Sequence, residues 1–193
     1  MKKMNKVNSR GFTLIELLAV IVILAIVMVL ASTTVLPFMR NASRDAFGLE
    51  ANALIDSASN AVSLLQIGTI DSQGIYEGVT NVAASDFKKT AGTGGAVTYC
   101  FSLKYLVETG LFDLDSGSLN TKSLSADAQE IDGYVGTVVA TKAANKTSYT
   151  YSVSIANKDF FVNGATNTVD ETDNVKQMTD NKLPTGFKYS CAN

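Results

Sequence analysis

Hydrophobic residues concentrate in one segment near the start of the chain. Of the 27 residues at positions 12–38, 21 are hydrophobic, and positions 17–31 form an unbroken apolar run of 15. At about 1.5 Å per residue, a helix over this segment is longer than the ~30 Å hydrocarbon core of a bilayer. The segment is therefore predicted to be a membrane-spanning helix.

Beyond residue 38 the pattern becomes amphipathic. Apolar residues recur at gaps of three and four, which is typical of a single buried face of a helix. This stripe consists of Phe47, Ala51, Leu54, Ala58, Ala61 and Leu65. The face between them is predicted to be exposed and contains Arg44, Asp45, Glu50, Asn52, Asp56, Ser57 and Asn60. Because Gly68 is a stop signal, one continuous helix is predicted over residues 12–67.

The rest of the chain, residues 68–193, is predicted to form an α+β head. Residues 83–96 are interpreted as a loop because they contain three glycines and two lysines. Residues 100–110 are predicted to hold a short helix that Ser102 caps and Gly110 ends. Strand patterns cover residues 134–140, 147–155 and 160–162, followed by a polar tail at 166–182. The expected fold is a long N-terminal helix, packed at its C-terminal half against an antiparallel meander of three or four short strands.

Composition excludes several classes of enzyme. The chain has 193 residues, no histidine, two cysteines and a formal net charge of −2. Catalysis by Ser-His-Asp or Cys-His groups and HExxH zinc sites require histidine, and two cysteines without CxxC spacing do not make a zinc site. No catalytic, cofactor-binding or metal site is expected, and the protein is predicted not to be an enzyme.

The residues before the apolar segment are basic. Lys2, Lys3, Lys6 and Arg10 precede it without any acid, and such a bias keeps the N-terminus in the cytoplasm and places the following part outside. Three interpretations fit this arrangement. They are a secretory signal peptide, a plain single-pass anchor, and a leader that is cut at its boundary with the apolar helix; the first two leave the carboxylate of Glu16 unexplained.

The third interpretation is supported by a specific sequence. Residues 9–18 read Ser-Arg-Gly-Phe-Thr-Leu-Ile-Glu-Leu-Leu, which resembles the processing site of type IV pilins and the related pseudopilins. The resemblance implies that a prepilin peptidase cuts after Gly11 and methylates the new amine of Phe12. It also implies that the apolar helix stays in the membrane until an energy-consuming machinery assembles the subunits into a filament.

Glu16 lies five residues into the processed chain. An unpaired carboxylate in apolar surroundings is costly, so it is expected to find a cation or a proton. The resemblance implies that Glu16 meets the Phe12 amine of a neighbouring subunit in subunit assembly. The alternative is a tolerated interfacial glutamate near the helix end.

Cys100 and Cys191 form an even pair in a head that is expected to be exported, so a disulfide is predicted; two unpaired buried thiols are the alternative. The acidic residues Asp170, Glu171, Asp173 and Asp180 match no calcium-binding loop, and a solvated acidic loop is expected there. Lys142 and Lys146 beside Tyr149 and Tyr151 are too few for a nucleic-acid patch, so contact with nucleic acid is considered only at the level of a filament.

The sequence thus predicts a filament subunit with four parts. They are a cleaved leader (1–11), a transmembrane and polymerisation half of the helix (12–38), an amphipathic half (39–67) and a globular head (68–193). Its expected partners are copies of itself, the prepilin peptidase, the membrane and the assembly machinery, first in the cytoplasmic membrane and then at the cell surface. Such fibres serve adhesion, motility, DNA uptake or secretion. The alternatives are a pseudopilin of a secretion or competence system and a membrane-anchored binding module that does not polymerise.

Overall fold

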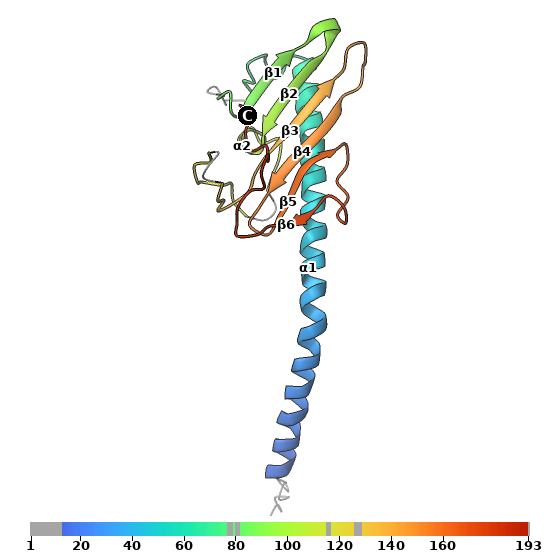
Figure 1. The fold of residues 1–193 in the computed structure, drawn as a ribbon, viewed down its shortest axis with the longest axis vertical. Coiled ribbons are helices and arrows are strands. Elements are labelled where there is room, and N and C mark those ends of the chain that lie inside the picture. The colour runs from blue at the N-terminus through green and yellow to red at the C-terminus, as the bar shows by residue number, and fades with distance from the viewer. Residues whose placement is uncertain (1–12, 77–78, 80–81, 115–116, 126–128, 193) are drawn as a thin grey trace, which may run out of the picture. The chain divides into compact units, whose positions relative to one another are not determined.

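A computed structural model describes residues 13–76, 79, 82–114, 117–125 and 129–192. The chain divides into two compact units, Met1–Ser43 and Arg44–Asn193. Helix α1, Leu14–Gln66, contributes residues to both units (Figure 1). Its bounds agree closely with the helix predicted over residues 12–67, apart from Phe12, which lies outside the described residues.

The part of α1 in the first unit satisfies its own polar groups. The hydroxyls of Ser32 and Ser43 donate to the carbonyl oxygens of Met28 and Met39, at 2.8 Å and 2.9 Å. The hydroxyl of Thr33 likewise donates to the Leu30 carbonyl at 2.9 Å. Such internal hydrogen bonds allow hydroxyl groups to enter apolar surroundings without an unpaired donor.

The second unit contains a six-stranded antiparallel sheet in which spatial order follows chain order (Figure 1). Its strands are β1 Phe87–Ala91, β2 Val97–Ser102, β3 Val135–Lys142, β4 Thr150–Ala156, β5 Phe160–Thr166 and β6 Lys176–Gln177. The short helices η1, Thr93–Gly95, and α2, Leu103–Glu108, flank β2. This arrangement confirms the predicted α+β fold and its antiparallel meander.

The number of strands was underestimated. The loop predicted over residues 83–96 is wrong for β1, of which only Phe87 is buried, so no alternation marks it in the sequence. Lysines at such a strand are common at sheet edges, where they oppose pairing with other chains. Cys100 and Phe101 belong to β2 rather than to the predicted helix, whereas Ser102 caps α2 as expected by accepting a hydrogen bond from the Tyr105 amide at 3.0 Å.

The amphipathic half of α1 buries the predicted stripe up to Ala61, whereas Leu65, its last member, is half-buried. Phe47, Ala51, Leu54, Ala58 and Ala61 are at most 2% exposed. They share one core with the inner face of the sheet, where the paired residues Phe101, Val138 and Val153 are fully buried. The aromatic ring of Phe47 lies 6.2 Å from that of Tyr134 and 5.9 Å from that of Phe160.

Two residues of the predicted exposed face have other roles. Ser57 is buried and donates to the Ala53 carbonyl at 2.9 Å. The side-chain Nδ2 of Asn52 donates to the backbone carbonyl of Val169 at 3.0 Å, and the side-chain Oδ1 of Asn52 accepts from the backbone amide of Val169 at 2.7 Å. Gly48 lies against the same segment, since a Cβ there would come within 2.6 Å of Glu171 Cγ. Together these contacts attach the chain after β5 to α1.

Gly136 allows β3 and β4 to approach each other, because a Cβ at this position would lie 2.3 Å from the backbone oxygen of Ser154. We expect Gly136→Ala to lower the free energy of unfolding by about 1–3 kcal/mol, since backbone must move. Gly48→Ala is the matched control, because only the flexible Glu171 side chain has to shift and alanine favours the helix. Thermal unfolding of the detergent-solubilised chain measures both, and equal losses would contradict the argument.

Candidate functional site

The first turn of α1 is closed by a reciprocal pair of side chains. The carboxylate of Glu16 accepts from the Thr13 amide at 2.8 Å and from the Thr13 hydroxyl at 2.9 Å. The Glu16 amide donates back to the Thr13 hydroxyl at 3.3 Å. This is a capping box, which satisfies backbone amides that have no partner within the helix.

The sequence contained the signal for this cap, a threonine followed three residues later by a glutamate, but the interpretation of Glu16 as an assembly residue did not use it. Thr13 is therefore the functional neighbour that sequence reasoning missed. Gly11 and Phe12, the residues of the predicted cleavage site, lie outside the described residues.

Helix α1 presents an apolar surface immediately after this cap. Its large hydrophobic side chains from Leu14 to Met39 are 48–83% exposed. Among the described residues, α1 is the one helix that is long and apolar enough to cross a membrane. Exposed apolar area on this scale marks a membrane or protein contact.

Comparison with known proteins identifies this end of the chain. Residues 6–32 match the family model described as the prokaryotic N-terminal methylation motif. The chain carries the class III signal of type IV pilins and pseudopilins. The signal indicates a pilin-like or pseudopilin precursor and points to a structural subunit rather than an enzyme. Neither a curated protein nor a solved structure matches the chain.

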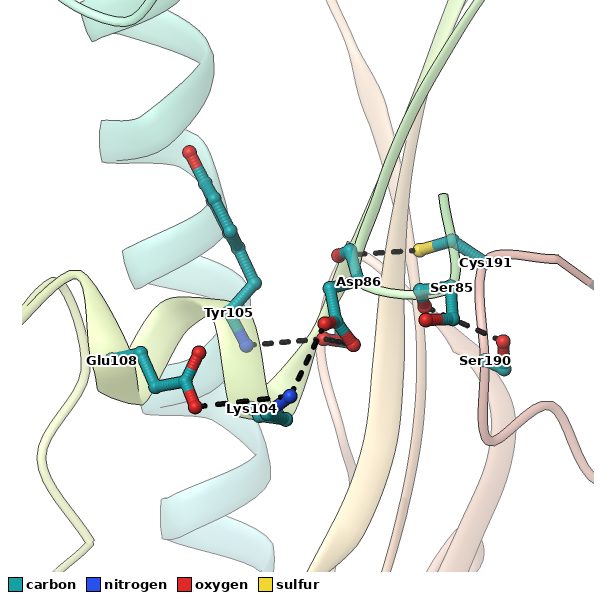
Figure 2. A network of polar contacts seen from close by, with 8 residues as sticks. Ser85, Asp86, Lys104, Tyr105, Glu108, Ser190 and Cys191 are labelled. Atoms are coloured by element: carbon teal, nitrogen blue, oxygen red, sulfur yellow. Dashed lines mark hydrogen bonds and ion pairs between the residues drawn. The ribbon is translucent and has the colours of Figure 1, made fainter. Parts of the chain in front are cut away.

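In the head, the predicted disulfide between Cys100 and Cys191 is present, with the Cα atoms 5.6 Å apart. Figure 2 shows Cys191 and Ser190 beside Ser85 and Asp86. The Cys191 amide donates to the Ser85 carbonyl at 2.8 Å. A disulfide sulfur has no proton to donate, so the 3.7 Å approach of Cys191 Sγ to the Asp86 carbonyl oxygen is a packing contact. The disulfide ties the C-terminal segment to β2, and the Ser85 hydrogen bond ties it to the segment before β1.

Ionic groups next to the disulfide are paired with one another. Lys104 Nζ lies 3.4 Å from the Asp86 carboxylate and 3.8 Å from that of Glu108 (Figure 2). Asp86 and Lys104 line a cleft of about 530 Å³. Lys122 lines the same cleft, and its Nζ lies 2.8 Å from the Glu130 carboxylate. Because these charges neutralise each other, every charged side chain that the structure describes on this cleft is paired.

One phenol nearby is strongly perturbed. Burial, with smaller contributions from Asp71 and Tyr76, raises the pKa of Tyr105 to about 12. The Tyr105 hydroxyl donates to the Gly74 carbonyl at 2.8 Å inside the core. A neutral phenol in this position acts as a structural donor and stays protonated at physiological pH.

The acidic segment after β5 is organised by its own backbone. The Asp170 carboxylate accepts hydrogen bonds from the amides of Thr172 and Asp173, at 2.8 Å and 3.1 Å, and from the Thr172 hydroxyl. The Thr172 hydroxyl is the main cause of the lowered pKa of Asp170, with Arg44 adding a smaller effect. In the described part of the chain, no three Asp, Glu, Cys or His side chains lie close enough to hold a metal ion.

Removing the disulfide by the double change Cys100→Ser and Cys191→Ser is expected to reduce the free energy of unfolding by about 2–5 kcal/mol, because the 91-residue loop regains entropy in the unfolded chain. Limited proteolysis should then cut the C-terminal segment first. Labelling of both cysteines by a thiol reagent in the unreduced wild-type protein would contradict the disulfide.

Proposed function

We propose that this protein is a structural subunit of an extracytoplasmic type IV pilus-like filament. In this proposal a prepilin peptidase cuts the precursor after Gly11 and methylates Phe12. The subunit then waits in the cytoplasmic membrane, with its N-terminus inside, until an assembly machinery adds it to the fibre. The observation that carries the proposal is the methylation motif at residues 6–32, which runs directly into a helix with exposed apolar side chains.

The energetics of the apolar half of α1 favour assembly from the membrane. Lipid tails are about as apolar as leucine, so a transfer from bilayer to filament core changes the hydrophobic free energy little. Release of the same side chains into water would be very unfavourable. The subunit therefore needs no soluble intermediate, and an energy-consuming machinery sets the direction of assembly.

Glu16 has two roles in this proposal. Its carboxylate completes the cap with Thr13 within one chain, and each carboxylate oxygen has lone pairs for a further donor. Cleavage creates the Phe12 amine next to this turn. We infer that Glu16 of one subunit pairs with the Phe12 amine of its neighbour and fixes their axial register.

A pseudopilin of a type II secretion or competence system is the second candidate, because the same signal precedes pseudopilins. A membrane-anchored binding module that does not polymerise would keep its leader. The mature N-terminus therefore separates the filament subunits from the anchor.

One prediction of this proposal concerns the mature N-terminus. Mass spectrometry of the protein from the membrane fraction is expected to find N-methylated Phe12 as the first residue. Gly11→Val should leave the leader attached, since it replaces the glycine after which the peptidase is proposed to cut with a bulkier residue. An intact Met1 on wild-type protein from cells that contain the peptidase would contradict the proposal.

Another prediction of the proposal separates two roles of Glu16, its negative charge and its part in the capping box with Thr13. Glu16→Gln keeps an acceptor for Thr13, because glutamine also completes a capping box, but it removes the negative charge. Glu16→Ala removes both. We expect both variants to be processed and held in the membrane, and both to give few filaments by electron microscopy.

Thr13→Val is the matched control, because it removes the hydroxyl of the cap and leaves the charge. It is expected to retain most of the filament yield. Normal yield with Glu16→Gln would show that the cap alone matters and would remove the pairing from the proposal.

A further inference from the structure

The two long hairpins of the head carry positive charge only. Residues 87–107 and 133–158, which include β1–β2 and β3–β4, contain no Asp or Glu. The lysines are Lys88, Lys89, Lys104, Lys142, Lys146 and Lys158. Three of them, Lys89, Lys142 and Lys146, lie at the connected ends of the hairpins, which we call the basic end. This was not evident from the sequence, because the residues of β1 were interpreted as a loop.

Contacts hold the basic end together. The two hairpin connections touch, since a Cβ on Gly94 would lie 3.2 Å from the Cβ of Ala144. Lys89 Nζ and Lys142 Nζ each lie 5.8 Å from the ring centroid of a tyrosine, Tyr99 and Tyr149 respectively. The tyrosine rings are 6.1 Å apart. The ammonium groups of these two lysines thus lie over the faces of neighbouring tyrosine rings in a cation–π arrangement.

The lysines of the basic end are not paired with any carboxylate that the structure describes. In the described part of the chain, ion pairs involve Lys104 and Lys122, and Lys89, Lys142 and Lys146 take part in none. The tyrosine row of the basic end reaches α1: Tyr151 lies in the same row of the sheet as Tyr99, and its hydroxyl donates a hydrogen bond to the hydroxyl of Ser59 in α1. From residue 58 to its end at Gln66, α1 carries no charge either. Among the described residues, this positive charge is therefore not neutralised by an ion pair.

Acidic residues gather at the opposite end of the strands. Asp159 lies in the β4–β5 turn, directly before Phe160. The ring of Phe160 contacts that of Phe47, which is near the start of the buried part of α1. The segment with Asp170 and Asp173 lies against Gly48 and Asn52 of the same part. Asp159, Asp170 and Asp173 are exposed there and Glu171 is partly exposed, so these four acids outnumber the nearby cations Arg44, Lys158 and Lys176. We call this the acidic end.

We propose that the basic end of one head binds the acidic end of the next copy of this chain. A contact between two different surfaces of identical subunits is heterologous and generates open helical fibres. Complementary charges suppress wrong orientations and fix register, whereas apolar packing is not directional. This inference rests on the proposed filament function and names the head surfaces that align the subunits.

Charge reversal tests the inference in cells that assemble the fibre. Lys146→Glu is expected to lower the amount of sheared filaments about tenfold, because it places like charges together. Lys188→Glu is the matched control, since Lys188 is exposed in the C-terminal segment and makes the same change of net charge. The double variant Lys146→Glu with Asp159→Lys is expected to recover filaments to within about twofold, because it restores opposite charges.

Zero-length carbodiimide crosslinking of intact wild-type filaments gives a second readout. We expect Lys142 or Lys146 to be joined to Asp159 or Asp173. Within one copy, the seven residues of β4 separate these groups by roughly 23 Å, so such a crosslink must join two copies. Filaments without these crosslinks would overturn the inference.

The remaining outcomes are also decisive. Normal filaments from Lys146→Glu would overturn the inference while leaving the filament function intact. If those filaments also bind less duplex DNA than wild-type filaments, the basic end serves a polyanion instead. If wild-type cells with methylated Phe12 make no fibre that contains this chain, the proposed function fails and the inference fails with it.

Discussion

The packing of one helix face against the sheet is the interaction on which the rest of the head depends. Phe47, Ala51, Leu54, Ala58 and Ala61 fill the space over the inner face of the strands. Small residues dominate this stripe, and small side chains let a helix approach its neighbours closely. The same helix continues into the segment whose large apolar side chains are exposed, so the head and that segment share one continuous element.

Helix α1 has residues in both units of the chain, and its side chains are in different surroundings in each. In the first unit, large apolar side chains stay exposed and the hydroxyls of Ser32, Thr33 and Ser43 bond to the helix backbone. In the second unit, polar groups of the helix are used in tertiary contacts, as in the paired hydrogen bonds of Asn52 with Val169. A helix suits both because its backbone hydrogen bonds are satisfied internally in either surroundings.

The outer parts of the head are fastened by buried side chains such as Val175 and Phe187 together with a few specific contacts. The disulfide and the Ser85 carbonyl hold the C-terminal segment, while Asn52 and Gly48 hold the segment after β5. These contacts bring together residues about a hundred positions apart in the chain.

The sequence by itself determined the features that depend on local periodicity or on a contiguous motif. The helix, its buried stripe, the Ser102 cap and the processing motif could all be predicted, because residues close in the chain define each of them. The tertiary structure alone decided β1, β2 and β6, the burial of Ser57 and the roles of Asn52 and Gly48. Strand β1 has one buried residue and exists because β2 supplies its hydrogen bonds, and the gathering of Lys89, Lys142 and Lys146 follows only from that pairing.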